Sequence, residues 1–328
     1  MPGVILAGDI GGTKTHLGLF RADGTTLTPL RDHAYATTAF PNLEAVVTDF
    51  LGDAAINAAC FGVPGPVIDG VSHATNVPWD ISESTAATAL GGAPTRLIND
   101  LEATAYGVLH LDDHEITILH KGEIRVSPAT IAVIAAGTGL GESALIATGV
   151  GWYAIATEGG HSDFAPRGRD QVELLEFLTG EFGSHVSFER VLSGPGLHNI
   201  YRFLAARAGS PAPDWLAQRM RTEDPSAVIS DAALAGADPY CVRAMEMFVA
   251  IYGAEAANLA LKFLALGGVY LGGGIAPKIL PFLQRGDFVR AFLDKGRLKS
   301  TLERIPVRVS LNPAAALLGA AHVAASML

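Results

Sequence analysis

The chain has 328 residues, of which 49% are hydrophobic and 17% are charged, and its formal net charge is -10. This length and composition predict two domains or one large α/β unit with a packed interior, and they exclude a disordered chain. The acidic balance argues against a general nucleic-acid or anionic-membrane surface, because such surfaces bind through basic patches. Cys60 and Cys241 lie far apart, which excludes a disulfide framework and a CxxC metal motif. No uncharged apolar run approaches the roughly 20 residues of a membrane span, and no basic leader precedes an apolar core, so we expect a soluble, cytoplasmic protein.

The first distinctive stretch, residues 8–15, joins two apolar runs near the amino terminus. Both runs have the pattern of strands, which places Gly11 and Gly12 at the tip of a hairpin. Backbone N–H groups that no side chain obstructs can form an anion-binding concavity at such a tip. Asp9 can hold Mg²⁺ or its water, and Lys14 can offer positive charge to a phosphate. An ordinary hairpin with Gly-Gly at its tip explains the same residues equally well.

The next segments alternate between helix and strand signals. Apolar residues recur at helical spacing after Asn42, which is a favoured helix cap. Residues 58–63 form an apolar run that stops at residues 64–66, Pro-Gly-Pro, and they predict a buried strand.

A further strand runs directly into a helix within residues 96–109. Asn99 and Asp100 stand at the switch between the two elements, and open α/β sheets bind ligands at this end of a strand. A carboxylate there suits acid/base chemistry. Asn and Asp are also favoured helix caps, and on the local residues alone the cap is the stronger interpretation.

Residues 131–146 repeat the amino-terminal pattern of apolar strand, glycine turn with threonine, and apolar strand. The second turn is Gly137-Thr138-Gly139. Two such turns indicate two related α/β halves that each present a phosphate-binding turn across a cleft, because phosphoryl transfer needs the β- and γ-phosphates to be gripped from both sides. Two short matches can also arise by chance.

Paired glycines separate Glu158 from His161 and let both side chains approach a small ligand. A Glu/His pair suggests hydrogen bonds to vicinal hydroxyls or part of a metal site. Metal is the weaker choice, because no cysteine cluster or further histidine lies nearby. Glu189 falls in the first turn of a short helix capped by Ser187, where a surface acid is the ordinary interpretation.

The carboxyl-terminal half is predicted to be largely helical. Residues 205–230 have the composition of a surface connection with one helix at residues 215–220. Residues 239–266 are apolar nearly all round, as in long buried helices. The Ala/Leu-rich residues 313–327 predict a helix that packs back on the first domain.

A third glycine run closes a strand at Gly272-Gly273-Gly274, and a helix is expected to begin near Pro277. Three adjacent glycines allow a flat base or ribose to lie against the backbone. A plain loop is the alternative.

Six motifs together resemble the bacterial-type glucokinase family, and they run in order through nearly the whole chain: GDIGGT at 8–13, LIND at 97–100, AGTGLG at 136–141, EGGHSDFAP at 158–166, ERVLSGPG at 189–196 and LGGGI at 271–275. The resemblance implies an α/β, two-domain actin-like ATPase fold of the hexokinase type. It implies a small α/β domain of residues 1–110 plus 313–328, a larger α+β domain of residues 111–312, and a substrate cleft between them.

The resemblance also implies a role for each matching residue. Asp100 is expected to be the general base that takes the proton from the sugar 6-hydroxyl. The sugar is expected to bind Asn99, Asp100, Glu158, His161 and Glu189, because carboxylate, amide and imidazole groups suit the hydroxyls of a pyranose. ATP, with Mg²⁺, is expected to bind through Gly8, Asp9, Ile10, Gly11, Gly12, Thr13, Gly137, Thr138, Gly139, Gly272, Gly273 and Gly274. No resident metal site is expected.

Two departures narrow this resemblance. Many members of the family have Asn where Lys14 stands. The related ROK group of sugar kinases and repressors carries a cysteine-rich zinc motif after a similar Glu-Gly-Gly-His segment, whereas residues 162–166 here contain no cysteine, which argues against zinc and against ROK membership. A first strand that starts at Val4 leaves no room for an amino-terminal helix-turn-helix, so we do not expect a transcription factor.

The expected function is therefore that of an ATP-dependent glucokinase that makes glucose 6-phosphate and ADP, with D-glucose and ATP as its partners, and with a homodimer as its assembly. One alternative is a sugar-binding regulatory protein on the same scaffold, which could dispense with Asp100. Another is a kinase for a different hexose, such as mannose, or for a different phosphoryl donor, because discrimination between epimers rests on one hydroxyl contact.

Overall fold

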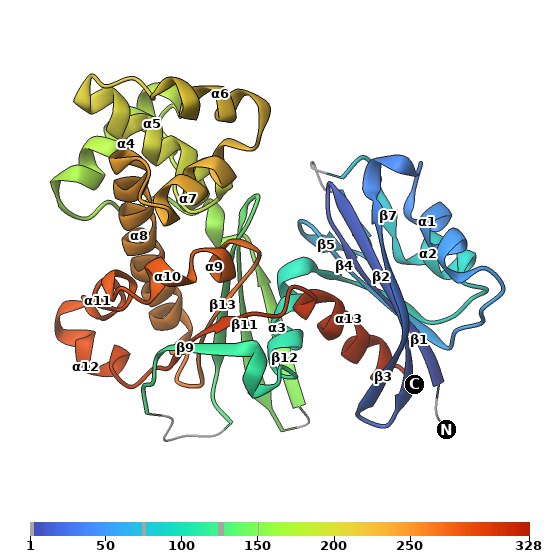
Figure 1. The fold of residues 1–328 in the computed structure, drawn as a ribbon. Coiled ribbons are helices and arrows are strands. Elements are labelled where there is room, and N and C mark those ends of the chain that lie inside the picture. The colour runs from blue at the N-terminus through green and yellow to red at the C-terminus, as the bar shows by residue number, and fades with distance from the viewer. Residues whose placement is uncertain (1–2, 74–76, 124–127, 150) are drawn as a thin grey trace. The chain divides into compact units, whose positions relative to one another are not determined.

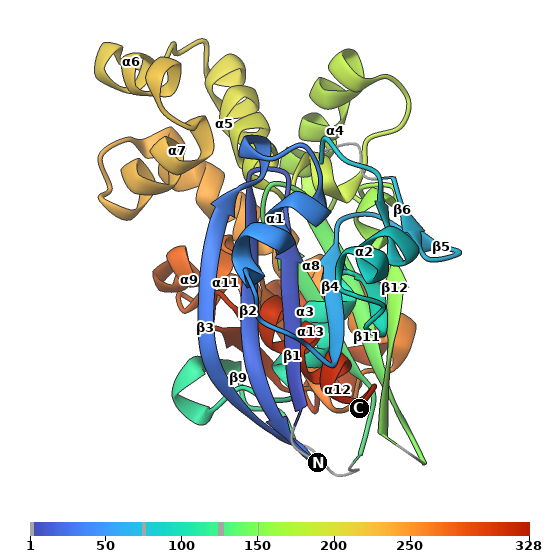
Figure 2. The same cartoon turned by 90° about the vertical axis from the view of Figure 1, so that its right-hand side faces the viewer.

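The amino-terminal hairpin forms as its glycine pattern predicts. In the computed structural model, which describes residues 3–73, 77–123, 128–149 and 151–328, strand β1 (Gly3–Ile10) pairs antiparallel with β2 (Lys14–Asp23). The chain forms two compact units, whose elements Figures 1 and 2 trace in two views. Unit 1 comprises Met1–Ile116, Ser143–Thr157 and Asn312–Leu328, and unit 2 comprises Thr117–Glu142 and Glu158–Leu311. The domain bounds expected from the sequence stay a prediction.

Unit 1 contains a five-stranded sheet of order β3-β2-β1-β4-β8 and a small sheet of order β5-β6-β7. The bounds of its other elements are β3 (Thr26–Ala36), α1 (Leu43–Leu51), β4 (Ala58–Val63), β5 (Val67–Ile68), β6 (Val71–Ser72), β7 (Ile81–Ser82), α2 (Glu83–Ala89), β8 (Thr95–Asn99), α3 (Asp100–Val108) and α13 (Ala315–Ala325). Asn42 caps α1 as predicted, because its side chain accepts a hydrogen bond from the Ala45 N–H.

The five-stranded sheet is buried on both faces, because successive residues of a strand point to opposite sides. Leu6 and Ile10 of β1 pack in the cluster that includes the apolar face of α1, whereas Ile5 and Ala7 pack in the cluster that includes α13. Figure 1 shows α1 and α2 on one face of this sheet and α3 with α13 on the other. The carboxyl-terminal segment is therefore helical and packs on the amino-terminal strands, as expected.

Helices α3 and α13 cross at two glycines. A Cβ at Gly107 would lie 1.9 Å from the Ala315 carbonyl oxygen, and one at Gly319 would lie 1.8 Å from that of Ala103. Only glycine permits such an approach between helix backbones. The position of α3 is thus set by its contact with α13.

A six-stranded sheet repeats the connectivity of the first. Its order is β12-β11-β10-β13-β14-β9, and β10 pairs parallel with β13 and β13 with β14, just as β1 pairs with β4 and β4 with β8. The bounds of its strands are β9 (Ile116–His120), β10 (Ile131–Ala136), β11 (Leu140–Thr148), β12 (Gly151–Thr157), β13 (Gly268–Gly272) and β14 (Val307–Ser310). This repeated order supports the two related halves inferred from the paired glycine turns.

The helices of unit 2 surround the buried helix α8 (Pro239–Phe263). Their bounds are α4 (Gly168–Phe182), α5 (Gly194–Ala208), α6 (Asp214–Thr222), α7 (Pro225–Leu234), α9 (Ile275–Lys278), α10 (Leu280–Leu283), α11 (Asp287–Leu293) and α12 (Lys299–Leu302). The helix after the third glycine run begins at Ile275, two residues before Pro277, near which it was expected. Pro277 lies inside α9, which is tolerated because the first turn of a helix does not use its N–H groups.

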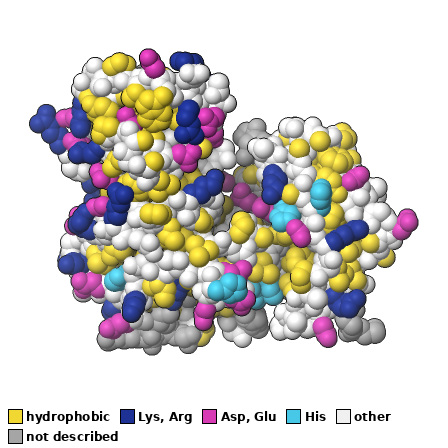
Figure 3. Space-filling view, viewed as in Figure 1, with side chains coloured by type: hydrophobic (Ala, Val, Ile, Leu, Met, Phe, Trp, Pro, Cys, Tyr) yellow, Lys and Arg dark blue, Asp and Glu magenta, His cyan; other side chains and the backbone are white. Residues whose placement is uncertain are grey.

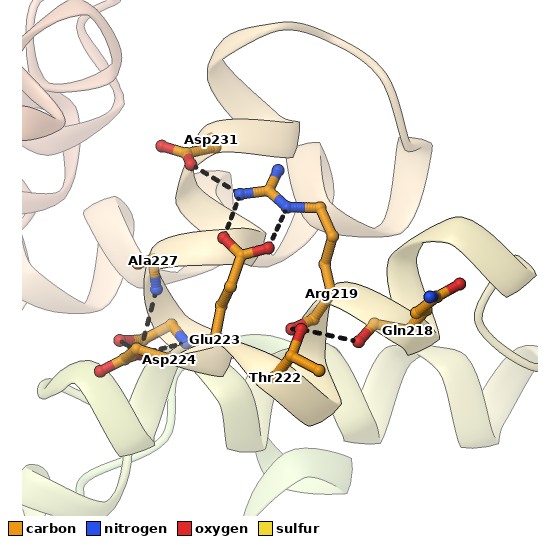
Figure 4. A network of polar contacts seen from close by, with 8 residues as sticks. Gln218, Arg219, Thr222, Glu223, Asp224, Ala227 and Asp231 are labelled. Atoms are coloured by element: carbon orange, nitrogen blue, oxygen red, sulfur yellow. Dashed lines mark hydrogen bonds and ion pairs between the residues drawn. The ribbon is translucent and has the colours of Figure 1, made fainter.

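Residues 205–230 are more ordered than the expected surface connection. Helices α6 and α7 occupy most of this range, and Leu216 and Ile229 are fully buried in the core of unit 2. Arg219 of α6 joins the two helices, since it binds Glu223 in bidentate fashion at 2.8 Å and Asp231 at 3.2 Å (Figure 4). The helix expected at residues 215–220 is confirmed by α6, whereas the surface connection is wrong. The polar residues on the exposed faces of these two short helices outnumber the few buried ones, and so give the segment a surface composition.

The molecular surface carries charges of both signs. Figure 3 shows Lys and Arg side chains interspersed with Asp and Glu side chains on the face in view. Cys60 and Cys241 are both free and buried. Within the described residues, no helix combines the length and the apolar character that a membrane crossing needs.

Candidate active site

The first glycine turn, residues 11–13, is held by Thr37. The Gly11 N–H donates to the Lys14 carbonyl at 2.9 Å, which closes the turn. Thr37, which begins the short 3-10 helix η1 (Thr37–Ala39), donates its hydroxyl to the Gly11 carbonyl at 2.7 Å and its N–H to the Thr13 carbonyl at 3.0 Å. Thr37 is fully buried, so its two hydrogen bonds to the turn are shielded from water. No sequence motif marked Thr37.

The residues that precede this turn lie within β1 and have different surroundings. A Cβ at Gly8 would lie 2.4 Å from the Phe61 ring, so packing alone requires glycine there. Ile10 is 1% exposed and belongs to the core. Asp9 is half-buried, and burial raises the pKa of its carboxyl group, although the nearby charges of His16 and Lys14 oppose that shift.

Asn99 ends β8 and caps α3. Its side-chain oxygen accepts the Leu101 N–H at 2.9 Å, its Nδ2 donates to the Gly65 carbonyl at 3.1 Å, and its own N–H donates to Glu102 at 2.9 Å. This arrangement is a capping box, so the cap interpretation of Asn99 is correct. The bonds also fix the Asn99 side chain against the loop that follows β4.

Asp100 is the first residue of α3 and is partly buried. Its Oδ1 accepts the Leu101 N–H at 2.9 Å. Parallel pairing aligns Val63 of β4 with Asn99 of β8, and Gly62 of β4 with Asp9 of β1. Asp9, near the end of β1, and Asp100, directly after β8, therefore lie at the same edge of the five-stranded sheet. Ligands of open α/β sheets bind at this edge, the carboxyl ends of parallel strands.

The second glycine turn is held at both ends by one segment of unit 2. The Leu140 N–H donates to Glu189 Oε2 at 3.0 Å, and the Gly194 N–H donates to the Gly137 carbonyl at 2.8 Å. A bond of 2.8 Å from the Gly137 N–H to the Gly139 carbonyl closes the turn itself. Glu189 lies in the 3-10 helix η4 (Phe188–Arg190) and is half-buried.

Glu158 and His161 lie beside the same turn. His161 Nε2 is 3.9 Å from the Glu158 carboxylate, and the two side chains are 58% and 52% exposed. Glu158 precedes the 3-10 helix η3 (Gly159–His161), and His161 is its last residue. A Cβ at Gly160 of this helix would lie only 2.0 Å from the Leu140 carbonyl oxygen. The structure of unit 2 therefore brings Glu158, His161 and Glu189 together around the second turn.

The third glycine run adjoins the second. Ala135 of β10 pairs with Gly272 of β13, and Gly273 has a φ of 76° with its Cβ position 2.6 Å from the Ala136 carbonyl oxygen. Tyr252 of α8, which sequence reasoning did not single out, supports this edge: its hydroxyl donates to the Ile134 carbonyl at 3.2 Å and accepts the Ala136 N–H at 3.4 Å. A tyrosine in an apolar helix carries no sequence signal for such a role.

Each unit thus carries part of the predicted set. Unit 1 contains the first turn, Asp9, Asn99 and Asp100, and unit 2 contains the other two glycine runs with Glu158, His161 and Glu189. Across the described ranges, the side chains of His, Cys, Asp and Glu form no cluster of three or more that could hold a metal ion.

Comparison with known proteins shows which family this chain resembles. The sequence model of the family described as Glucokinase matches residues 6–327. The glucokinase of Synechocystis sp. is 42% identical over 346 residues, covering 98% of this chain and 97% of that protein. A solved glucokinase from an Antarctic psychrotroph is 31% identical, with a TM-score of 0.84, and covers 98% of this chain and 99% of its own. The glucokinase of Balamuthia mandrillaris, solved in complex with glucose, is 25% identical, with a TM-score of 0.82, and covers 98% of this chain and 94% of its own.

These matches extend over nearly the whole chain, and they identify its architecture as the actin-like fold of hexokinases. Sequence identities of 31% and 42% over 98% of the chain show common family membership. The chain therefore belongs to the glucokinase family, whose members are enzymes that phosphorylate glucose.

Proposed function

We propose that this chain transfers the γ-phosphoryl group of ATP to the 6-hydroxyl of D-glucose, with Asp100 as the general base. The observation that carries the proposal is the clustering of Glu158, His161 and Glu189 around the glycine turn at residues 137–139. Carboxylate and imidazole groups bind vicinal hydroxyls, and a glycine turn binds phosphate oxygens. Both kinds of group are what a sugar kinase needs.

Asp100 takes the proton as the sugar oxygen attacks. The bond from O6 to the γ-phosphorus forms, the bond from that phosphorus to the ADP oxygen breaks, and the O6 proton moves to the Asp100 carboxylate. Asn99, Glu158, His161 and Glu189 bind the remaining hydroxyls and hold O6 in line. Positioning of this kind, together with charge stabilisation, supplies most of the acceleration in phosphoryl transfer.

The phosphates of ATP bind at the two glycine turns and the adenosine at residues 272–274. Backbone N–H groups in such turns form anion-binding concavities, and the hydrogen bonds from Thr37 and Gly194 hold both turns in shape. ATP enters as its magnesium complex. Mg²⁺ keeps most of its waters and needs only one or two protein carboxylates beside the phosphates, so Asp9 alone is a sufficient partner.

We place the reaction in the cytoplasm, where ATP is available and where the free thiols of Cys60 and Cys241 stay reduced.

The proposed assembly is a homodimer. Sedimentation equilibrium of the purified protein measures its mass, and a single species at the mass of one chain would contradict this.

The experiment that tests the function is ADP release by the purified protein with magnesium ATP, measured with and without glucose. Turnover that depends on glucose is expected, and mannose and other hexoses run in parallel rank the sugars. No turnover with any sugar, combined with calorimetric binding of glucose, would instead indicate a sugar-binding regulatory protein. Turnover with another sugar or another phosphoryl donor would redirect the substrate assignment.

A further inference from the structure

The Glu189 side chain, which is proposed to bind the sugar, also contacts the second glycine turn at residues 137–139, here called the phosphate turn. Its Oε2 accepts the Leu140 N–H at 3.0 Å, directly after Gly139. Its own backbone is fixed in turn, since the Ser193 hydroxyl donates to the Glu189 carbonyl at 2.7 Å. The segment that begins at Glu189 therefore reaches the turn twice, the second time through the Gly194 N–H.

The two glycines of this turn differ sharply in their surroundings. A Cβ at Gly139 would lie 2.6 Å from Glu189 Oε2, closer than any normal contact. A Cβ at Gly137 would meet no atom within 4 Å among the residues that the structure describes. Both glycines lie outside the left-handed region, so an alanine fits the backbone at either position. The same added methyl group thus displaces Glu189 from one position and not from the other.

We propose that Glu189 is a positioning residue for the phosphate turn in addition to its role as a sugar ligand. One carboxylate oxygen holds the Leu140 amide while the other binds a sugar hydroxyl. Because the two oxygens belong to one rigid planar group, a bound sugar restrains the carboxylate and, through it, the turn. Sugar and nucleotide affinities are then coupled, and thermodynamic linkage makes that coupling reciprocal. This inference rests on the proposed function and names how the two substrates of that site communicate.

The first test measures glucose binding by calorimetry in the absence of nucleotide. A direct effect of the substitution on ATP binding then cannot contribute to the measured affinity. Gly139→Ala should weaken glucose binding about tenfold, because its methyl group pushes away a charged hydrogen-bonding partner of the sugar. Gly137→Ala, the matched control in the same turn, should change the glucose affinity by less than about twofold. Equal effects of the two variants, or an unchanged affinity in Gly139→Ala, would overturn the inference.

The second test uses kinetics to separate the role of Glu189 in sugar binding from its role in positioning the turn. Glu189→Gln keeps a side-chain oxygen that can accept the Leu140 N–H, whereas Glu189→Ala keeps none. Both variants should raise the KM for glucose, but only Glu189→Ala should also raise the KM for ATP, by about tenfold at saturating glucose. An ATP KM that stays at the wild-type value in Glu189→Ala would refute the positioning role.

Measurements on the wild-type protein show whether a negative result contradicts the proposed function or only the coupling through Glu189. A wild-type chain that neither binds nor phosphorylates glucose contradicts the proposed function itself. A wild-type chain that does both, beside a Gly139→Ala variant of normal glucose affinity, contradicts only the coupling through Glu189. Far-UV circular dichroism of each variant confirms that the comparison is made between folded proteins.

Discussion

Asn99 and Asp100 are neighbours with different structural duties at the start of α3. Asn99 makes three hydrogen bonds that cap the helix and anchor it to the loop after β4, so any change there affects stability as well as ligand binding. The Asp100 side chain accepts a hydrogen bond from the Leu101 N–H, and an asparagine oxygen can replace this acceptor. Asp100→Asn is therefore the variant that tests the chemical step while keeping this bond.

Asp100→Asn should lower kcat by about 10²- to 10⁴-fold, the usual contribution of a general base, because the amide cannot accept the proton of the sugar hydroxyl. Glucose binding by calorimetry should change little, since the amide keeps the size and an oxygen of the carboxylate. Asp23→Asn, at the exposed end of β2, is the matched control and should leave kcat unchanged. Near-normal turnover of Asp100→Asn would show that another group is the base.

Two buried glutamates, Glu142 and Glu255, form a carboxyl pair that has no part in the proposed reaction. Glu142 of β11 is 1% exposed and Glu255 of α8 is fully buried. Asn258 donates to Glu255 at 2.7 Å, and Lys262 lies 3.4 Å from the other oxygen of the same carboxylate. Burial, reinforced by the charge of Glu255, raises the pKa of Glu142 to about 8. Burial raises the pKa of Glu255 as well, and the hydrogen bond between the two side chains favours a proton on the Glu142 carboxyl group.

This pair predicts a decline of stability with rising pH. The unfolded chain releases the Glu142 proton near its ordinary pKa of 4.5, whereas the folded protein keeps it until about pH 8. The free energy of unfolding should fall between these values, by about 1.4 kcal/mol per pH unit for one such group, and level off above them. In Glu142→Gln this decline should be smaller, so the stability of the variant relative to wild type should grow with pH.

Urea denaturation at several pH values between about 5 and 9 measures this difference. Glu176→Gln, on the exposed side of α4, is the control and should follow the pH dependence of the wild type. A stability difference between Glu142→Gln and wild type that does not vary with pH would contradict the buried proton.

At the scale of elements, the crossing of α3 and α13 positions the helix that begins with Asp100. The two helices meet through Gly107 and Gly319, where their backbones approach each other directly. At the far end of α3, the His110 ring stacks on His322 of α13 with centroids 3.3 Å apart and an interplanar angle of 6°. A shift of α13 must therefore move α3 and the proposed base with it.

Gly319→Ala should lower the free energy of unfolding by about 1 to 3 kcal/mol or more, because the new methyl group would overlap the Ala103 carbonyl and force the helices apart. Gly180→Ala in α4 is the matched control, since among described residues nothing lies within 4 Å of its Cβ position. That control should gain up to about 1 kcal/mol from better helix propensity. Urea denaturation of both variants checks the contrast, and equal effects would show that the crossing tolerates a side chain.

At the scale of the whole molecule, each unit contains part of the residue set proposed to bind glucose. Ligands that bind only the folded protein raise its stability by mass action, by about 2.7 kcal/mol at a concentration of 100 times Kd. D-glucose should therefore raise the melting temperature in a concentration-dependent manner, without ATP. Asp100→Asn should respond similarly, because binding precedes chemistry.

L-glucose, which has the same composition but mirror-image hydroxyl positions, is the control for this measurement. It should leave the melting temperature unchanged when scanned at the same concentrations. Equal shifts with both sugars would indicate a solvent effect in place of a specific site.

Local sequence signals determined much of the secondary structure and the family. The hairpin around Gly11, the cap at Asn42 and the strand-to-helix switch at Asn99 were predictable, because each depends on residues within a few positions of one another. Six ordered motifs were enough to indicate the glucokinase family, which the comparisons confirm. The roles of the matching residues, including Asp100, stay predictions.

Contacts between distant segments were decided only by the tertiary structure. Nothing near Thr37, Gly194 or Tyr252 in the sequence announces that they hold the glycine turns or the strand beneath them. The same holds for the bond from the Leu140 amide to Glu189, which joins residues 49 positions apart. Hydrophobic periodicity specifies which face of an element is buried, but the partner of each backbone N–H or carbonyl depends on how the chain returns through space, and a single sequence does not encode that locally.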